Sequence, residues 1–395
     1  MDRIKKPRLL LLAIAVIAII SLYIAVALLL PFRPVQPTLK TLTVTAPNTG
    51  AITWPTYGQQ ALGAAGTGVL AANGTQTGVA IGSIAKLVLA LSVMEQKPFT
   101  LGEPGPVLTM TDQDVAFYKK YLAQNGSVVP VQVNETLTES QMLQALLLPS
   151  GDNIADSLAV WAFGSTDNYL KYASDLTNRL ALKQTHLADT SGLSPQSVSS
   201  ATDLVVIGEN VLKQPVLASI VSQSQATLPV VGVVKNIDSI LGQQGIVGIK
   251  TGSTDQAGGC FLFASQKTAS LTIIGAILNA PNLSAVLHDT ITFLKANSNV
   301  IQPVTVVSAG QVVGSYQTPW GKAVNVVAKS DLTAVAIGNQ TFLAKASLTT
   351  LAKPTPKDTV VGQVTVESGS KTQSVDAVLE SSLTKPGRLW RLLHP

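Results

Sequence analysis

The stretch AIGSIAKLVLALSVME, residues 80–95, places a serine and a lysine three residues apart where an apolar helical pattern begins. Residues at this spacing share one face of a helix, so Ser83 and Lys86 are predicted to lie side by side if a helix starts near Ser83. A serine hydroxyl is a weak nucleophile unless a base accepts its proton, and Lys86 is the base at hand. The pair indicates either a nucleophilic site or, since this spacing also arises by chance, a surface lysine near a helix cap.

A lysine can act as a base only in its neutral form, which burial or a second nearby cation would favour. Backbone N–H groups at the start of a helix could also face a developing oxyanion. The spacing of Ser83 and Lys86 alone therefore does not decide between the two interpretations.

Two further motifs follow later in the chain. LLLPSGDNIADSLA, residues 146–159, places Ser150 and Asp152 in a turn between two predicted helices. GIVGIKTGST, residues 245–254, places Lys250 on a predicted strand that is followed by a turn. The order Ser-x-x-Lys, Ser-x-Asn and Lys-Thr-Gly is the motif set of penicillin-recognising serine enzymes.

With these motifs the chain resembles the low-molecular-mass penicillin-binding proteins of the D-alanyl-D-alanine carboxypeptidase family, from about residue 56 to the C terminus. The stretches YGQQALGAAGTGVLA (residues 57–71) and DTSGLSPQSVSSATDLVVIG (residues 189–208) add to the resemblance. It implies an α+β fold of the penicillin-binding and β-lactamase-like transpeptidase type. In that fold helices flank an antiparallel sheet and form a helical subdomain, and here a C-terminal all-β domain would follow.

The resemblance also implies roles for the motif residues. Ser83 would be the acylated nucleophile, Lys86 its general base, and Ser150 a relay for the proton that goes to the leaving D-alanine. Lys250 would bind the terminal carboxylate of the substrate and, as a nearby cation, keep Lys86 deprotonated. The expected substrate-binding residues are Asp152, Lys250, Thr251, Gly252 and Ser253.

The resemblance further implies that Thr251 adds a hydroxyl contact and that the backbone N–H groups of Ser83 and Ser253 form the oxyanion hole. An edge strand that carries Lys-Thr-Gly also makes physical sense, because an extended peptide can pair with its free backbone groups, while Gly252 would keep the surface open.

The second motif departs from the family pattern, because Asp152 stands at the asparagine position and Asn153 follows one residue late. An asparagine both accepts and donates hydrogen bonds, whereas an ionised aspartate only accepts. A carboxylate beside Lys86 would also favour the ammonium form, which cannot act as a base. The site is therefore detuned, rearranged to bring Asn153 inward, or catalytically dead.

The N-terminal region predicts a membrane helix. Residues 9–30 carry no charge and are long enough to cross a bilayer. The flanking cations at positions 3, 5, 6 and 8 favour a cytoplasmic location for residues 1–8 and an extracytoplasmic one for the rest. The alternative is a signal peptide cleaved after Ala27, but the apolar run is long for a signal core and continues past that residue.

The rest of the chain divides into three regions that differ in composition and in sequence pattern. Residues 31–50 are rich in Pro and Thr and predict an extended linker. Residues 51–297 mix helical and strand patterns and form the predicted penicillin-binding domain, with helices near 84–95, 140–150, 153–164, 165–183 and 201–214 and strands near 245–253, 260–266 and 270–278. Residues 298–395 contain short Val- and Thr-rich runs typical of a small β-sandwich or barrel. The basic tail at 385–395 could touch a membrane interface, but it is short and is expected to be a plain C terminus.

Composition excludes several function classes. Of the net charge of +5, three units come from the first eight residues, so no basic surface for nucleic acid is expected. The single cysteine, Cys260, excludes an internal disulfide, and the three histidines have no metal-ligand spacing, so no metal or cofactor is expected.

Three functions follow from these observations. The first is a membrane-anchored serine D,D-carboxypeptidase that removes the terminal D-alanine of peptidoglycan stem peptides and is acylated by β-lactams. The second is a low-activity or inactive homologue that binds the cell wall as a scaffold. A β-lactamase ranks below both, because Glu209 is the one glutamate between the second and third motifs and lies inside a predicted helix.

Overall fold

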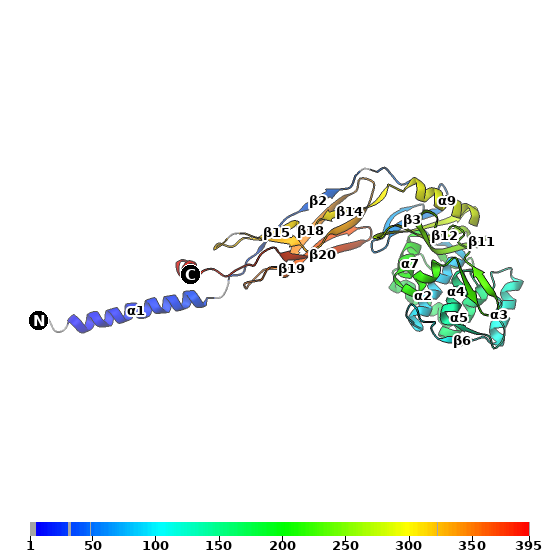
Figure 1. Ribbon diagram of the computed structural model, residues 1–395, viewed down its shortest axis with the longest axis horizontal. Coiled ribbons are helices and arrows are strands. Elements are labelled where there is room, and N and C mark those ends of the chain that lie inside the picture. Colours follow the sequence, from blue (N-terminus) through cyan, green and yellow to red (C-terminus); the bar gives the residue numbers. More distant parts are fainter. Residues whose placement is uncertain (1–4, 31–32, 48, 322, 395) are drawn as a thin grey trace.

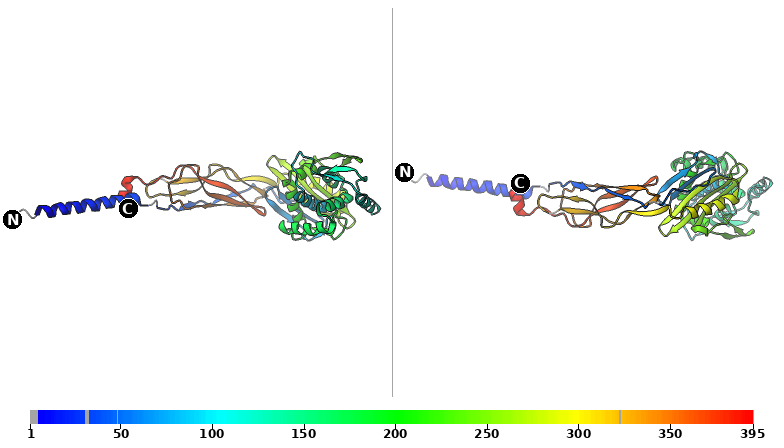
Figure 2. Two further views of the ribbon diagram at one scale, coloured as in Figure 1. Left: turned by 90° about the horizontal axis from the view of Figure 1, so that it is seen from below. Right: turned by 90° about the horizontal axis from the view of Figure 1, so that it is seen from above.

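The computed structural model describes residues 5–30, 33–47, 49–321 and 323–394. In Figure 1 the N-terminal helix α1 (Lys5–Leu29) lies at one end, a β-rich stalk follows, and a mixed α/β head lies at the far end. Both views in Figure 2 show the same linear order. The predicted cytoplasmic segment at residues 1–8 begins outside the described residues.

The head is built on an antiparallel sheet with the strand order β11-β12-β13-β3-β4. Side chains alternate between the two faces of a strand. On β12, Phe261 and Phe263 therefore pack with helix α9 (Leu283–Ala296) on one face, while Leu262 and Ala264 join the core of the helical subdomain on the other. The strands are β3 (Gln59–Ala64), β4 (Gly68–Asn73), β11 (Ile246–Thr254), β12 (Gly258–Thr268) and β13 (Leu271–Ala280).

The helical subdomain surrounds α2 (Lys86–Gln96), whose residues from Lys86 to Met94 are all buried. This burial on every side explains why the sequence there is apolar without a polar stripe. The neighbouring helix α4 ends at Leu147, two residues before Pro149, which cannot continue a helix. The other helices are α3 (Asp112–Ala123), α4 (Glu139–Leu147), α5 (Asp152–Phe163), α6 (Thr166–Arg179), α7 (Ala201–Lys213) and α8 (Pro215–Val221).

The stalk contains a seven-stranded sheet in the order β1-β15-β16-β20-β19-β18-β2 and a separate pair, β14-β17. Its interior is an apolar cluster that includes Tyr316, Val326 and Phe342. The strands from the C-terminal region are β14 (Ile301–Val307), β15 (Val312–Tyr316), β16 (Val324–Ala328), β17 (Leu332–Ile337), β18 (Thr341–Leu348), β19 (Val360–Ser368) and β20 (Lys371–Leu379).

The segment expected to be a linker is part of this stalk. β1 (Pro37–Leu39) pairs with β15, and β2 (Leu42–Thr45) pairs with β18 at the opposite end of the strand order. Since β1 and β2 are separated by two residues, the sheet must curl until its two edges almost meet. Residues 37–45 are thus not a free spacer, because their backbone groups hydrogen-bond to strands from the C-terminal region.

A turn of the stalk fixes the head in place. Lys371 in β20 forms an ion pair of 2.5 Å with Glu209 in α7, and the Gln373 amide donates to the Gly66 carbonyl at 2.7 Å. Ser370 N also donates to Thr67 O at 3.1 Å. These contacts join the β19–β20 turn and the start of β20 to α7 and to the β3–β4 turn. The head and the stalk are therefore in contact at a further place, besides the two places where the chain passes from one to the other.

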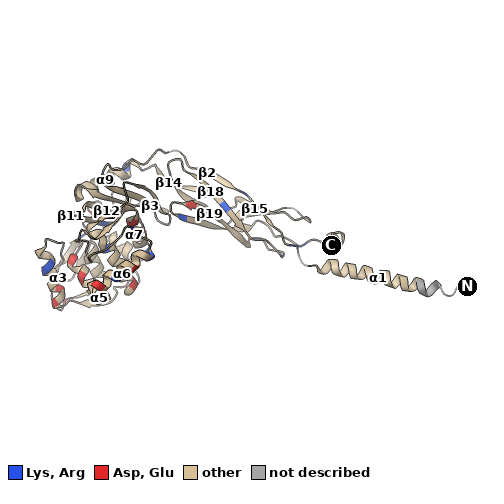
Figure 3. Ribbon diagram, turned by 180° about the vertical axis from the view of Figure 1, so that it is seen from behind, with Lys and Arg blue, Asp and Glu red and all other residues tan. Residues whose placement is uncertain are grey.

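Helix α1 is an apolar helix whose run from Leu9 to Leu29 is long enough to cross a membrane. Figure 3 shows no charged residue along this run. It could be a membrane anchor or a signal sequence.

Candidate active site

The predicted nucleophile and the predicted base of the first motif lie at the start of the central helix. Ser83 is in a 3₁₀ turn (Gly82–Ala85), and Lys86 is the first residue of α2. Side chains three residues apart eclipse each other in a 3₁₀ turn. Lys86 Nζ consequently lies 2.9 Å from Ser83 Oγ, with Lys86 fully buried and Ser83 partly exposed. The pair is buried on the lysine side and open on the serine side, as a nucleophile that meets a substrate requires.

The amine of Lys86 has three hydrogen-bond acceptors. Besides Ser83 Oγ, it donates to Asp152 Oδ1 at 2.6 Å and to the Ser191 carbonyl at 2.8 Å. An ammonium group carries three N–H donors, so each of them has a partner. This arrangement suits a protonated Lys86, in which Ser83 Oγ accepts a hydrogen bond from the lysine instead of donating one to it.

The geometry distinguishes the two alternatives for the second motif. Asp152, at the N terminus of α5, is the residue that contacts Lys86. Asn153 is buried on another side, where its amide accepts from Val129 N at 2.9 Å and donates to Val129 O at 2.8 Å. Asn153 therefore fixes the preceding loop and does not face the site.

Ser150 occupies the turn between α4 and α5 with a left-handed backbone, at a φ of 67°. Its side chain is buried, and its hydroxyl has no hydrogen-bond partner among the described residues. A non-glycine residue in this conformation is uncommon and costs backbone energy. A strained, unpartnered hydroxyl in the loop that carries Asp152 is a candidate for contact with a ligand.

The third motif lies on β11, the edge strand of the sheet beside the Ser83 turn. A Cβ atom on Gly252 would lie 2.3 Å from the Ile81 carbonyl oxygen, and one on Gly82 would lie 3.0 Å from Ser253 N. Glycine at position 252 is therefore needed for a different reason than the open strand surface that the sequence led us to expect. Gly252 lets β11 and the nucleophile turn touch through their backbones, which brings the N–H groups of Ser83 and Ser253 to one region.

Lys250 is a second buried lysine near the first. Burial, together with the nearby positive charge of Lys86, lowers the pKa of Lys250 to about 7, although Asp152 and Asp238 act in the opposite direction. Its amine donates to the Thr251 carbonyl at 3.2 Å, and Thr251 is itself buried. The charge of Lys250 thus depends on its neighbours and changes near neutral pH.

Asp238 belongs to this group of charges although no motif indicated it. Its side chain is buried, one carboxylate oxygen accepts from Ile240 N at 3.1 Å, and the other has no partner among the described residues. Burial raises its pKa to about 6. The preceding residue, Ile237, donates its N–H to Leu148 O and so ties this loop to the Ser150 turn.

Ser191 also escaped the motif analysis, because it acts through its backbone carbonyl. Asp189 holds its turn by accepting from Ser191 Oγ at 2.8 Å and from Gly192 N at 3.1 Å. Gly192 has a φ of 82°, and a Cβ there would lie 2.0 Å from Gly82 O. The DTSG sequence at 189–192 is the one signal that could have pointed to this turn.

Of the predicted site residues, Lys86 thus contacts both Ser83 and Asp152. The charges of Lys86 and Asp152 also act on the pKa of the nearby Lys250. Over the described residues, no group of three or more His, Cys, Asp or Glu side chains could hold a metal ion.

The family model for D-alanyl-D-alanine carboxypeptidase, peptidase S11, matches residues 61–282. The chain belongs to this family. The match includes all three motifs of the site, from Ser83 to Ser253, and ends before the stalk strands of the C-terminal region.

Individual S11 relatives are distant. The chain is 31% identical over 143 residues to D-alanyl-D-alanine carboxypeptidase DacA of Escherichia coli K12, a match that covers 35% of each protein. It is 25% identical over 169 residues to DacF of Bacillus subtilis, covering 40% of this chain and 42% of the relative. The matched part therefore spans less than half of the length of these curated relatives.

Solved structures confirm the predicted α+β transpeptidase fold with a β-rich C-terminal region. PBP3 of Streptococcus pneumoniae, a peptidoglycan synthesis regulatory factor, superposes with a TM-score of 0.66 at 21% identity and covers 82% of this S11 chain and 98% of its own. Penicillin-binding protein 5 of Haemophilus influenzae gives 0.63 at 18% identity, with 87% and 100% coverage. The Streptomyces K15 DD-transpeptidase gives 0.55 at 25% identity, with 64% and 98% coverage.

Proposed function

We propose that this protein is a serine D,D-carboxypeptidase that removes the terminal D-alanine from peptidoglycan stem peptides and is acylated by β-lactams. The observation that carries the proposal is the 2.9 Å contact between Ser83 Oγ and the buried Lys86 amine, beside a second buried lysine, Lys250, on the edge strand. Membership of the S11 family supports the same reaction class.

The geometry supports the following sequence of steps. A neutral Lys86 accepts the proton of Ser83 as Oγ bonds to the carbonyl carbon between the two D-alanines, and the N–H groups of Ser83 and Ser253 hold the resulting oxyanion. Ser150 relays the proton held by Lys86 to the amide nitrogen, the C–N bond breaks, and D-alanine leaves with a protonated amine nitrogen. Water then attacks the ester carbonyl and gives a proton to Lys86. This proton returns to Ser83 Oγ as the ester bond breaks and the shortened peptide leaves as a carboxylate. Lys250, when charged, binds the substrate carboxylate, and Thr251 adds a hydroxyl contact.

Release of free D-alanine tests this function. The full chain in detergent should release D-alanine from a peptide that ends in D-alanyl-D-alanine, and Ser83→Ala should release none. The same peptide with L-alanine as its last residue is the substrate control. Equal release by Ser83→Ala would contradict the proposal, because it would show that Ser83 is not the nucleophile.

A low-activity homologue is the second candidate, and one observation favours it. Lys86 donates to three acceptors, and the nearest is the Asp152 carboxylate at 2.6 Å. A carboxylate in this position stabilises the ammonium form, which cannot accept the proton of Ser83. The β-lactamase alternative gains no support, since Glu209 is held by Lys213, Lys371 and Gly66 N at the contact between head and stalk.

The shifted pKa values of Lys250 and Asp238 predict that Asp238→Asn raises KM for the peptide at high pH but not at low pH. The carboxylate of Asp238 acts to raise the pKa of Lys250, so its loss lowers that pKa below about 7. If the pKa falls by about one unit, the charged fraction of Lys250 at pH 8 drops about tenfold. KM for the peptide should then rise about tenfold at pH 8 and change little at pH 5.5, where Lys250 is charged in both proteins.

The control for this measurement is Asp255→Asn, which removes an exposed carboxylate from the turn after β11. It should leave KM unchanged at both pH values. An equal rise in KM at pH 5.5 and pH 8 for Asp238→Asn would mean that Asp238 supports the loop and has no effect through the charge of Lys250.

We further propose that α1 stays attached as a single-pass anchor, with the catalytic head outside the cytoplasm. The uncharged run from Leu9 to Leu29 and the flanking N-terminal cations support this topology. The stalk would then hold the active site away from the membrane, where cross-linked wall material lies. N-terminal sequencing of the membrane-bound protein should begin at or near Met1.

A further inference from the structure

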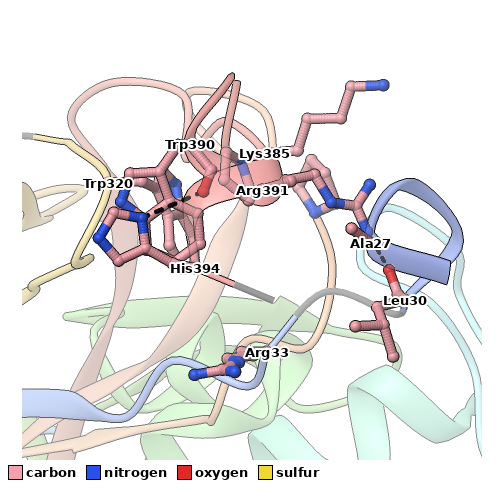
Figure 4. A pocket seen from close by; sticks show the side chains of 10 residues that line it. Ala27, Leu30, Arg33, Trp320, Lys385, Trp390, Arg391 and His394 are labelled. Carbon is pink, nitrogen blue, oxygen red and sulfur yellow. Dashed lines mark hydrogen bonds between the residues drawn. The ribbon is translucent and has the colours of Figure 1, made fainter. Parts of the chain in front are cut away.

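The C-terminal residues of the chain lie beside the last turns of α1 (Figure 1). Tyr23 Oη in α1 donates to Leu392 O in the C-terminal helix α10 (Arg388–Leu393) at 2.6 Å, and the Arg391 guanidinium donates to Leu30 O. Figure 4 shows this second contact. Ala27 is 2% exposed on a helix whose other described side chains are mostly open. The C-terminal residues are thus a docked helix, unlike the plain terminus expected from the sequence.

A cavity of about 220 Å³ opens between the two helices and the stalk. Three cations line it: Arg33 comes from the segment after α1, and Lys385 and Arg391 come from the C-terminal segment. No aspartate or glutamate is among its described lining residues. A cavity with this charge suits an anion, and at about 30 Å³ per water it has room for a phosphate group with several waters.

Aromatic rings form the wall of the cavity on the stalk side. Trp390 meets Trp320 edge to face with ring centroids 5.3 Å apart, and His394 stacks on Trp390 at 4.7 Å. The indole of Trp320 donates to Thr384 O at 3.0 Å, which fixes it to the segment before α10. Tryptophan is enriched at membrane interfaces, where one part of the ring is apolar and the other is wet.

The position of the cavity relative to α1 indicates its environment. The apolar run of α1 ends at Leu29, and the cavity begins at Ala27 and Leu30, so it lies level with the end of the span. Two leucines of α10, Leu389 and Leu393, are 72% and 67% exposed. In a bilayer that contains α1, these side chains would lie among acyl chains and the three cations would lie at the depth of the phosphates.

We propose that this cavity binds the phosphate headgroup of an anionic phospholipid in the outer leaflet. The inference rests on the proposed retention of α1 as an anchor. An anionic lipid is favoured over a zwitterionic one because the cationic choline group of the latter would be repelled by Arg33, Lys385 and Arg391. Bound lipid would join α1, α10 and the stalk, and so hold the stalk at a fixed angle to the membrane.

Counting bound lipids on the full chain tests the proposal. The protein in nonionic detergent is titrated with phosphatidylglycerol or phosphatidylcholine, and the intact complexes are weighed by native mass spectrometry. One phosphatidylglycerol should bind in preference to phosphatidylcholine. A cation near a lipid surface contributes about fivefold in affinity, so the reversal in Lys385→Glu should weaken phosphatidylglycerol binding about 25-fold. Lys385→Arg should retain it.

The matched control is Arg388→Glu. Arg388 is an exposed cation three residues after Lys385, at the start of α10, but it does not line the cavity, so its reversal should leave the bound lipid in place. Equal losses in Lys385→Glu and Arg388→Glu, or equal binding of the two lipids, would overturn the proposal, because both results indicate general adsorption. Displacement of the lipid by millimolar inorganic phosphate would overturn it in favour of a free-anion site.

Two measurements on the same preparation separate this inference from the proposed function. An N-terminal sequence that starts after Ala27 would remove the anchor and the lipid site together. Penicillin labelling at Ser83 depends on neither, so a protein that is labelled but binds no lipid would contradict this inference alone.

Discussion

A fluorescent penicillin is expected to label the full chain covalently at Ser83, and Ser83→Ala is expected to abolish the label. The hydroxyl is the group that forms the ester, and the variant lacks it. Mass spectrometry of the digested protein should place the adduct on the peptide that contains Ser83. The matched control is Ser92→Ala, which removes a buried hydroxyl in α2, the helix that follows Ser83, where it donates to Val88 O. This variant should keep the label.

Loss of Lys86, the proposed general base, should slow acylation almost as much as loss of Ser83. A general base contributes about a hundred- to ten-thousandfold to such a step, so Lys86→Met should slow acylation by that factor. The change leaves Asp152 buried without its partner, which destabilises folds. The double variant Lys86→Met, Asp152→Asn avoids that charge and should be equally slow. Rapid labelling of a folded Lys86 variant would show that Lys86 is structural.

The second large effect is expected from Asp152→Asn, which should speed acylation and D-alanine release. The carboxylate lies 2.6 Å from Lys86 Nζ and stabilises the ammonium form of the base. An asparagine removes that charge and adds an N–H that can donate to a substrate carbonyl. One hydrogen bond made in the transition state changes rates about ten- to a thousandfold, so the gain should fall in that range.

Penicillin acylation and D-alanine release are to be measured side by side for the wild type and Asp152→Asn. Unchanged or slower acylation would show that Asp152 is not a detuned asparagine.

Asn153→Ala is the companion variant. It removes two buried hydrogen bonds to Val129 and should cost about 1–3 kcal/mol of unfolding free energy per group left unpaired. The pH profile of acylation should stay as in the wild type. A complete loss of acylation with an unchanged melting temperature would instead place Asn153 in the site.

The sequence indicated the site through spacing within single elements. Ser83 and Lys86 are three residues apart, and Lys250 lies on an apolar strand run, so local geometry with an ordered motif set was enough to predict their roles. It could not decide between Asp152 and Asn153, because adjacent residues at a helix start point in directions about 100° apart and the start of α5 sets which one faces Lys86. Asp238 and Ser191 were missed since each reaches the site through tertiary packing of a loop.

In the fold, too, elements that are neighbours in the sequence could be predicted, whereas pairings between distant segments could not. Strands β11, β12 and β13 follow one another and were read from alternation and turns. The pairing of β2 with β18 joins Thr45 to Thr341, and the docking of α10 joins Leu392 to Tyr23. No pattern within either segment specifies such a partner. Short polar strands near residue 40 therefore looked like a linker.

The same pairing sets an order of events during biosynthesis. Thr45 and Thr341 are 296 positions apart. At roughly 5–20 residues per second, the ribosome needs about 15–60 s to supply the partner of β2 after β2 itself has been made. The head, complete by residue 297, has all of its own strands well before then. The first strands to be synthesised, β1 and β2, are consequently among the last to pair with their neighbours. The head can therefore fold while the backbone groups of β1 and β2, which precede it in the chain, are still unpaired.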